Sequence, residues 1–227
     1  MKFKSQVLTQ VSGSVGGITY SHNKGGLYQR ARTIPTDPQT AVQVVMRNFM
    51  SQLVVRWTAI LTQAQRDAWA VYAANVPVTD LLGDSMLISG LNWYVKLNSI
   101  RRQASIAVAD NAPTVFTTAS LTTPLFTVVA ATDLASVAFV NTDSWATAAL
   151  GALLVYFSRP QSVGVNFFKG PYRFAGKVAG AATPPTSPQS IALPFLVAVG
   201  NKVFAQFIAT DQDGRASGII RSSAIAG

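Results

Sequence analysis

The chain has 227 residues and a formal net charge of +9 at pH 7, with no cysteine and one histidine, His22. Without cysteine, a disulfide framework or a thiolate metal site is excluded, and a single histidine excludes sites built from several imidazoles. A Ser-His-Asp catalytic set would have to use His22, which we expect at a loop tip. Every acidic residue is Asp, so Glu–Lys pairs are missing and we expect few helices, each well packed.

The first predicted element is a β-hairpin, within a segment that we expect to be β over residues 1–35. Alternating residues favour two strands, the first with Ile18 and Tyr20 and the second with Tyr28, Arg30 and Arg32. The intervening Asn23-Lys24-Gly25-Gly26 provides residues that adopt the positive φ of a tight turn. His22 at this tip is interpreted as a solvated turn residue rather than a ligand.

A helix is predicted to follow the hairpin, from Pro38 to about Leu61. Thr36 or Asp37 can cap it, and Pro38 fits the first turn because its missing N–H would have had no partner there. Apolar residues at spacings of three and four form one stripe along it: Val42, Val45, Met46, Phe49, Leu53 and Trp57.

Two further helices are predicted before residue 110. Thr62-Gln63-Ala64-Gln65 has the spacing of a capping box, so a second helix begins there and ends before Pro77. We expect it to bury Ala68, Trp69, Tyr72 and Ala73, and a third helix from about Ser89 to Gln103 to bury Leu91, Tyr94, Leu97 and Ile100. Trp57, Trp69, Trp93 and Tyr94 should meet in one small core rather than form a base-stacking platform.

The segment from Asp110 to Pro113 is the predicted boundary between two domains, 1–110 and 111–227. Beyond it the helical period disappears, and short strands alternate with Pro, Gly and Asp. The expected strands span residues 114–121, 125–131, 136–140, 152–158, 174–178, 190–195, 202–210 and 217–222. The sequence therefore predicts an α+β protein: a β-hairpin and small helical unit, then an antiparallel β-sandwich of the immunoglobulin or fibronectin-type-III shape.

Two loops of the second domain are candidates for binding. Asp211-Gln212-Asp213-Gly214-Arg215 is predicted to be a hairpin loop, and a plain turn is favoured over calcium because two carboxylates are too few for a site. Gly164–Arg173 gathers aromatic and basic residues, among them Phe167, Phe168, Tyr172 and Arg173. This loop either contacts a partner or folds back over the end of the core, and the sequence leaves both alternatives open.

The charge and hydropathy patterns limit the possible partners. Basic residues concentrate in the first third but never form a run of five, which favours an acidic partner and makes nucleic acid the weaker alternative. The N-terminus lacks the apolar core of a signal peptide, so we expect no export. The longest apolar run, Ala146–Phe157, is too short to cross a bilayer.

Four stretches of the N-terminal half form a recognisable pattern: Gly-Ser-Val-Gly-Gly-Ile-Thr-Tyr from Gly13, Gly-Gly-Leu-Tyr-Gln-Arg-Ala-Arg from Gly25, Asp-Pro-Gln-Thr with Gln43 and Arg47, and Leu-Thr-Gln-Ala-Gln-Arg-Asp-Ala-Trp from Leu61. In these stretches the chain resembles a family of uncharacterised proteins encoded by tailed bacteriophages, prophages and some bacterial genomes. The resemblance extends to about Asn98 and continues only in patches, at residues 156–161 and 213–217.

The resemblance implies a structural protein of the virion, assembled in the host cytoplasm, and carries over no functional residues. We expect it to decorate or cement the capsid shell through the N-terminal domain, with the major capsid protein or other virion proteins as partners. A homo-oligomer is expected, and a trimer is assumed from how such proteins commonly work. Low charge and a glycine-rich hairpin that can extend a neighbour's sheet fit this role. The predicted partner-binding residues are Lys24, Gly25, Gly26, Tyr28, Arg30, Arg32, Phe167, Phe168, Tyr172 and Arg173.

Other functions remain open at this point. A tail or head–tail connector protein is the variant within the same class. A nucleic-acid-binding module would use Lys24, Arg30, Arg32 and Arg101-Arg102, and a receptor- or carbohydrate-binding protein would use the loops 164–173 and 179–188. An enzyme is not expected, because no base, nucleophile and orienting group assemble around Asp67, Asp80 and Asp84, and no cofactor or metal is expected.

Overall fold

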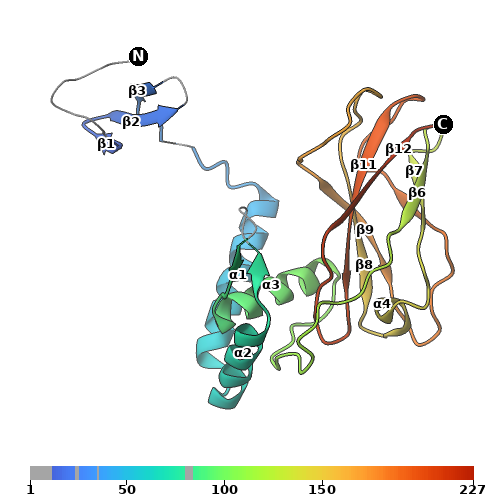
Figure 1. Cartoon of the computed structure of the whole chain (residues 1–227), viewed down its shortest axis with the longest axis horizontal. Coiled ribbons are helices and arrows are strands. Elements are labelled where there is room, and N and C mark those ends of the chain that lie inside the picture. The colour runs from blue at the N-terminus through green and yellow to red at the C-terminus, as the bar shows by residue number, and fades with distance from the viewer. Residues whose placement is uncertain (1–11, 24–25, 35, 80–83) are drawn as a thin grey trace. The chain divides into compact units, whose positions relative to one another are not determined.

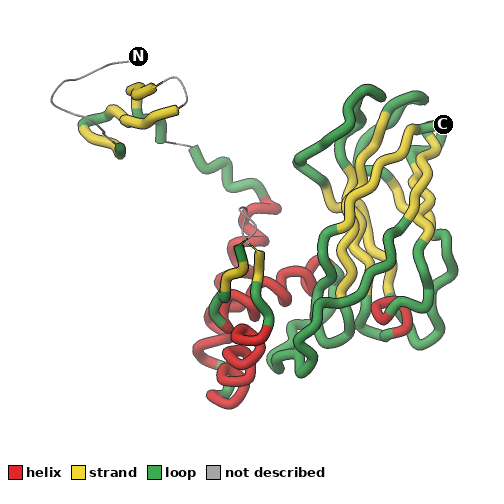
Figure 2. The backbone as a smooth tube through the Cα atoms, viewed as in Figure 1, coloured by secondary structure: helices red, strands yellow, loops and turns green. Residues whose placement is uncertain are grey.

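The structure is a computed structural model that describes residues 12–23, 26–34, 36–79 and 84–227. It contains helices and antiparallel sheets, which confirms the mixed α+β class (Figures 1 and 2). The chain divides into two compact units, residues 1–46 and residues 47–227. The boundary expected near residue 110 falls within the second unit and stays a prediction, although the helical core and the main sheet core form separate clusters there.

The first unit contains a three-stranded antiparallel sheet in the order β1-β2-β3. Its strands are β1 (Gly13–Val15), β2 (Ile18–Asn23) and β3 (Gly26–Ala31), so the predicted hairpin is confirmed. Gly16 and Gly17 join β1 to β2 with φ of 55° and 82°, values that favour glycine. His22 lies in β2 opposite Leu27 rather than in the turn, and the turn itself, 24–25, lies outside the described residues.

Helix α1 spans Ala41–Ala59, so it begins later than predicted. Its cap is Thr40: the Thr40 hydroxyl accepts the Gln43 N–H at 3.4 Å, and the Gln43 side chain accepts the Thr40 N–H at 3.2 Å. The expectation that Thr36 or Asp37 caps the helix, with Pro38 in its first turn, is therefore wrong. Asp37 instead accepts the N–H of Gln39, whose positive φ of 44° keeps these residues out of the helix.

Helices α2 (Gln63–Asn75) and α3 (Gly90–Gln103) lie where the sequence predicts them. Thr62 forms the full capping box with Gln65, and the Ser89 hydroxyl caps α3 by accepting the N–H of Asn92. The predicted aromatic core is confirmed, with ring centroids 5.4 Å apart for Trp57 and Tyr94, 5.5 Å for Trp69 and Tyr94, and 5.4 Å for Tyr72 and Trp93. Three positions expected inside differ: Ala68 is exposed, and Leu91 and Ile100 are only half-buried.

Between α2 and α3, two short strands, β4 (Val78–Thr79) and β5 (Ser85–Met86), form a pair that the sequence did not predict. After them the backbones of α2 and α3 approach closely. A Cβ atom on Gly90 would lie 2.9 Å from the backbone carbonyl carbon of Trp69, so only glycine fits this position without a shift.

The segment between α3 and the main sheets contains no strand, and the strand expected over 114–121 is wrong. Pro113 and Pro124 flank residues 114–123, and a side chain of α3 holds the start of the segment in place of a ladder. Asn98 donates to the carbonyl of Ala109 at 3.1 Å and accepts the N–H of the same residue at 2.8 Å. These bonds satisfy backbone groups that a neighbouring strand would otherwise pair.

Residues 125–227, here called the two-sheet region, contain the remaining strands. They are β6 (Leu125–Val129), β7 (Leu134–Ala138), β8 (Ala152–Phe157), β9 (Arg173–Ala179), β10 (Gln189–Ala192), β11 (Lys202–Thr210) and β12 (Ile220–Ile225). One sheet has the order β10-β7-β6 and the other β12-β11-β8-β9, all antiparallel. Side chains of both sheets enclose one core, which includes Phe126, Val137, Phe157 and Phe207.

The predicted strands of this region match seven observed ones, with β7 and β12 displaced by two and three residues. The first residues of the apolar run Ala146–Phe157 belong not to a strand but to a short helix, α4 (Ser144–Thr147), which buries Trp145. The chain then passes so close to this helix that a Cβ on Gly151 would lie 2.0 Å from the Trp145 carbonyl oxygen. This run is therefore a helix, a glycine turn and a buried strand.

Candidate functional site

The first group of predicted partner-binding residues lies on the N-terminal sheet. Gly26, Tyr28 and Arg30 are on β3 and Arg32 follows it, whereas Lys24 and Gly25 lie outside the described residues. Tyr28 pairs with Ser21 and Arg30 with Thr19, so the two side chains project from one face of the sheet. Arg30 is exposed and Tyr28 half-buried.

This sheet has no core of its own in the part that the structure describes. None of residues 12–22, 27–34, 36–41 and 43–46 is buried. The outer edges of β1 and β3 likewise pair with no other strand among the described residues. Small sheets gain independent stability only when they bury an apolar face, and an open edge can accept another strand. The sheet therefore offers main-chain groups and unburied side chains to a partner.

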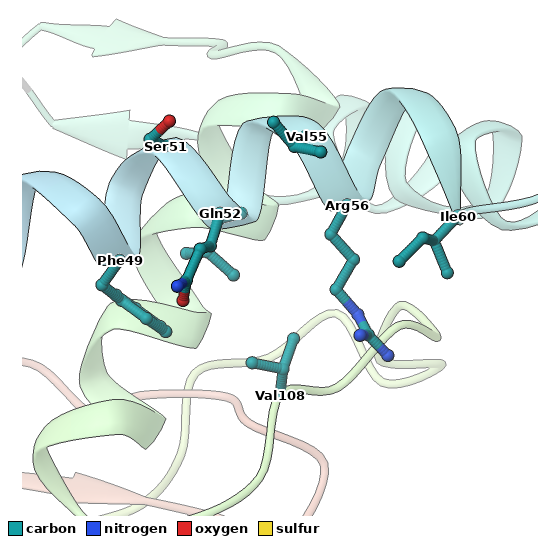
Figure 3. Close-up of a pocket in the computed structure, with 8 residues that line it drawn as sticks. Phe49, Ser51, Gln52, Val55, Arg56, Ile60 and Val108 are labelled. Carbon is teal, nitrogen blue, oxygen red and sulfur yellow. The ribbon is translucent and has the colours of Figure 1, made fainter.

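A groove lies along α1 in the helical part. Its volume is about 420 Å³, and its lining residues include Phe49, Gln52, Val55, Ile60 and Val108. Figure 3 shows Phe49, Gln52 and Ile60 projecting from one side of α1 toward the segment with Val108. Most of this lining is apolar, and Arg56 is its one titratable group among the residues that the structure describes. The groove therefore fits an apolar side chain of a partner better than a reacting substrate.

Exposed apolar side chains also follow α1. Met50, Val54 and Val55 are exposed, and Val55, which lines one edge of the groove, keeps 57% of its surface accessible. Figure 3 shows Val55 projecting from a different side of α1 than Phe49 and Ile60. Since twelve of the 19 residues of α1 are apolar, the helix has the composition of one that is covered on more than one side. An exposed apolar face of this kind typically marks an interaction surface.

Arg56 is fixed at the rim of the groove by Asp110. Its Nε and Nη2 donate to the two carboxylate oxygens of Asp110, each at 2.6 Å, and Tyr94 Oη lies 3.4 Å from the same carboxylate. The hydrogen bonds from Arg56 lower the pKa of Asp110. Burial, together with the Asp110 charge, raises the pKa of Tyr94 to about 12. All three groups hold their ordinary charge states at neutral pH, so this cluster positions α1 rather than transferring protons.

The second group of predicted residues lies in the loop between β8 and β9 and at the start of β9. The structure supports both alternatives for this loop in part. Phe168 stacks on Phe204 with centroids 5.7 Å apart, and the Tyr172 hydroxyl donates to the Phe168 carbonyl at 3.1 Å, so these rings fold back on the sheet. Phe167, in contrast, is 72% exposed. Arg173 begins β9, and its guanidinium lies 5.3 Å from the ring centroid of Phe195.

The two predicted groups belong to different compact units, residues 1–46 and residues 47–227. Sequence reasoning missed the exposed side of α1. The available signal was the apolar residues outside the predicted stripe, such as Met50, Val54 and Val55. Arg101, which the nucleic-acid alternative would use, is wrong for that role, because it is 4% exposed and donates to the carbonyls of Ala107 and Gln212, each at 2.9 Å.

The hairpin loop Asp211–Arg215 is confirmed as the connection between β11 and the segment that leads to β12. The Arg215 guanidinium forms ion pairs with Asp211 at 3.0 Å and with Asp213 at 2.6 Å, so both carboxylates of the loop bind the same cationic group. Within the described residues, no group of three or more histidine or acidic side chains could hold a metal ion. No described helix is long and apolar enough to cross a membrane.

In comparisons with known proteins, no family model, no curated protein and no solved structure matches this chain.

Proposed function

We propose that this chain is a structural protein of a tailed-phage particle, one that decorates or cements the capsid shell. The observation that carries the proposal is the apolar exposed side of α1, next to an apolar groove on the same helix. A helix left uncovered in this way is expected to be covered in an assembly by a neighbouring subunit. The sequence resemblance to phage proteins supports the same class of function.

The N-terminal sheet supports an anchoring role for this end of the chain. Its strands bury no described side chain, and its open edges can add to a neighbour's sheet through main-chain hydrogen bonds. Such bonds place little demand on the partner's side chains, and repetition by symmetry multiplies a weak contact. In this proposal the shell protein receives the sheet, and α1 packs against the shell or against another copy of the chain in a homo-oligomer, for which a trimer is assumed. The virion is then its location.

We further propose that the two-sheet region is a sandwich of the immunoglobulin or fibronectin-type-III shape. Counted in chain order, its first, second and fifth strands (β6, β7, β10) form one sheet, and the third, fourth, sixth and seventh form the other. A constant-type immunoglobulin domain places the first, second, fourth and fifth strands together, and the third, sixth and seventh together. The two arrangements differ only in the sheet that holds the fourth strand, β9, which supports the proposal.

The role can be tested by the copy number of the chain in purified particles of the phage that encodes it. Quantitative mass spectrometry against the major shell protein should give a fixed ratio with hundreds of copies per particle. A dozen copies or fewer would instead place the chain in the tail or the head–tail connector. Its absence from particles would overturn the structural role altogether.

The contribution of α1 can be tested with a pair of matched variants. Val55→Lys adds a charge to the exposed side of α1 and should reduce incorporation into particles while the protein stays folded, because the side chain already reaches solvent. Val71 on α2 has nearly the same exposure, 54%, so Val71→Lys is the control and should be incorporated normally. Normal incorporation of Val55→Lys would contradict the use of this surface.

A basic nucleic-acid-binding module is the second candidate, and the exposed side chains of Arg30 and Arg32 favour it. Such binding would weaken steeply with salt, because phosphate contacts release counterions. A mobility shift of duplex DNA that disappears between about 50 and 200 mM salt would support this function. A failure to shift DNA at the lowest salt would exclude it.

A further inference from the structure

Four cationic residues, Arg159, Lys169, Arg173 and Lys202, lie at the end of the two-sheet region where β8 finishes and β9 and β11 begin. A fifth, Arg221, is the second residue of β12 and lies against Tyr172 of the loop that leads to β9. Among the residues that the structure describes, none of them forms an ion pair with a carboxylate. The acidic residue at this end, Asp133, accepts the backbone N–H of Val197 at 2.8 Å. This end therefore has an excess of positive charge that the chain itself does not neutralise.

Four of these cations lie over aromatic rings. The guanidinium groups of Arg159 and Arg173 both lie over the ring of Phe195, 5.6 and 5.3 Å from its centroid. The Lys202 ammonium is 5.4 Å from Phe204, and the Arg221 guanidinium is 5.7 Å from Tyr172. A ring attracts a cation and fixes its position but leaves its N–H donors able to bind an anion. The positive groups are thus held in place with their hydrogen-bond donors unused by carboxylates.

A small pocket of about 220 Å³ lies beside Arg221. Its walls combine the aromatic residues Phe167, Phe168, Tyr172 and Phe204 with the polar residues Asn166, Arg221, Ser222 and Ser223. The loop that forms one wall is held by the stacking of Phe168 on Phe204 and by an edge contact of Tyr172 with Phe168, with centroids 5.2 Å apart. The pocket therefore offers apolar rings, amide and hydroxyl groups and one fixed guanidinium within a single depression.

We propose that this pocket binds one unit of an acidic polysaccharide, and that the neighbouring cations bind the adjoining units. A sugar ring has an apolar C–H face that packs on an aromatic ring, hydroxyl groups that bind amides and serine hydroxyls, and, in a uronic acid, a carboxylate that a guanidinium binds with two hydrogen bonds. The volume is below the roughly 300–1,000 Å³ of pockets that enclose a drug-sized ligand. It therefore fits one unit of a longer chain.

A single-stranded nucleic acid fits this surface less well. Such ligands need several ring faces on which successive bases stack. Phe168 and Phe204 already stack on each other, and Tyr172 lies against both Phe168 and Arg221. Phe167 remains as the one strongly exposed ring of the pocket. One exposed ring is enough for a sugar unit, so the observations favour a saccharide.

This inference does not depend on the proposed role of α1 in a phage particle.

The test is binding of oligogalacturonate, a polymer of a uronic acid, to the full chain by isothermal titration calorimetry at low salt. Neutral dextran and an oligo-dT of similar length are the comparison ligands. Arg221→Gln should weaken oligogalacturonate binding about tenfold, because it removes the fixed guanidinium and its charge-assisted hydrogen bonds. Phe167→Ala should weaken it about fivefold by removing the exposed ring. Both side chains are exposed, and unchanged circular dichroism would show that the variants fold.

Arg102→Gln is the matched control. Arg102 also lies over a phenylalanine ring, 5.5 Å from the centroid of Phe49, but on α3. The control should bind as the unaltered chain does, and dextran should not bind. An equal loss of oligogalacturonate binding in Arg102→Gln would show that net charge alone explains the effect of Arg221→Gln, and it would overturn the site. Tighter binding of oligo-dT than of oligogalacturonate, or no binding of oligogalacturonate, would also overturn the proposal.

Discussion

Replacing Trp69 by alanine should destabilise the helical core more than any other single truncation in α2. The indole is 1% exposed, and its ring contacts Tyr72 and Tyr94 with centroids 5.9 and 5.5 Å away. Loss of a buried tryptophan side chain costs about 3–5 kcal/mol through lost transfer free energy and the cavity left behind. The Nε1–H also donates to the carbonyl of Asp110 at 2.8 Å, and an acceptor left without its donor costs about 1–3 kcal/mol if it stays dry. The carbonyl is only partly buried and can bind water, so we expect a total near the upper end of about 3–5 kcal/mol.

The measurement is urea denaturation followed by circular dichroism at 222 nm, a signal dominated by α1, α2 and α3. Trp69→Phe separates the two contributions, because it keeps most of the ring packing and removes the N–H. It should cost about 1–2 kcal/mol, the value of a lost hydrogen bond with a modest loss of volume. A Trp69→Ala variant that loses less than about 1 kcal/mol would contradict a packed aromatic core, since a buried ring of this size cannot be removed so cheaply.

Two further predictions concern the same helical part. Gly90→Ala should cost about 1–3 kcal/mol, because the added Cβ collides with the backbone of Trp69, whereas Gly218→Ala, which meets nothing within 4 Å, should be nearly neutral in the same urea titration. The Arg56 hydrogen bonds lower the pKa of Asp110, so its carboxylate stabilises the fold above the unfolded-state pKa of about 3.9, and this is lost as the pH falls through the lower folded-state value. In Asp110→Asn the free energy of unfolding should therefore fall less on acidification than in the unaltered chain. The difference should be less than about 1 kcal/mol, since Arg56 is partly exposed.

The features predicted correctly from sequence are those that neighbouring residues determine. The capping box of Thr62 and Gln65 needs only residues three positions apart, and both members are where the pattern requires them. The aromatic core could be predicted because Trp69 and Tyr72 are three positions apart and therefore lie on the same side of α2, which is its buried side. Thr40 shows the limit of such reasoning. It caps α1 with Gln43 by the same geometry, but Thr36 and Asp37 are equally good capping residues in isolation.

The strand wrongly predicted at 114–121 shows where local pattern fails. β-branched residues favour extended backbone there, but a strand also needs a neighbour to pair with. Here the preceding segment is held by Asn98 and Arg101 of α3, whose side chains bind the carbonyls of Ala109 and Ala107. Hydrogen bonds from a helical side chain to the backbone of a loop cannot be inferred from periodicity, because periodicity indicates only which side of an element is buried. Arg101 reaches further, to Gln212, which lies more than a hundred positions along the chain.

The α1 surface was missed for a related reason. The predicted apolar stripe is confirmed only in part: Phe49 and Leu53 are buried, whereas Val45 is exposed. The same helix has apolar residues outside this stripe, and Met50, Val54 and Val55 find no cover within the described chain. Single exposed apolar residues are common on folded proteins, but three within two turns of one helix, beside an apolar groove, are not explained by the chain's own core. The pattern becomes intelligible only if a second surface completes it. This is why the proposed function rests on α1 and why Val55→Lys, compared with Val71→Lys, is the decisive pair of variants.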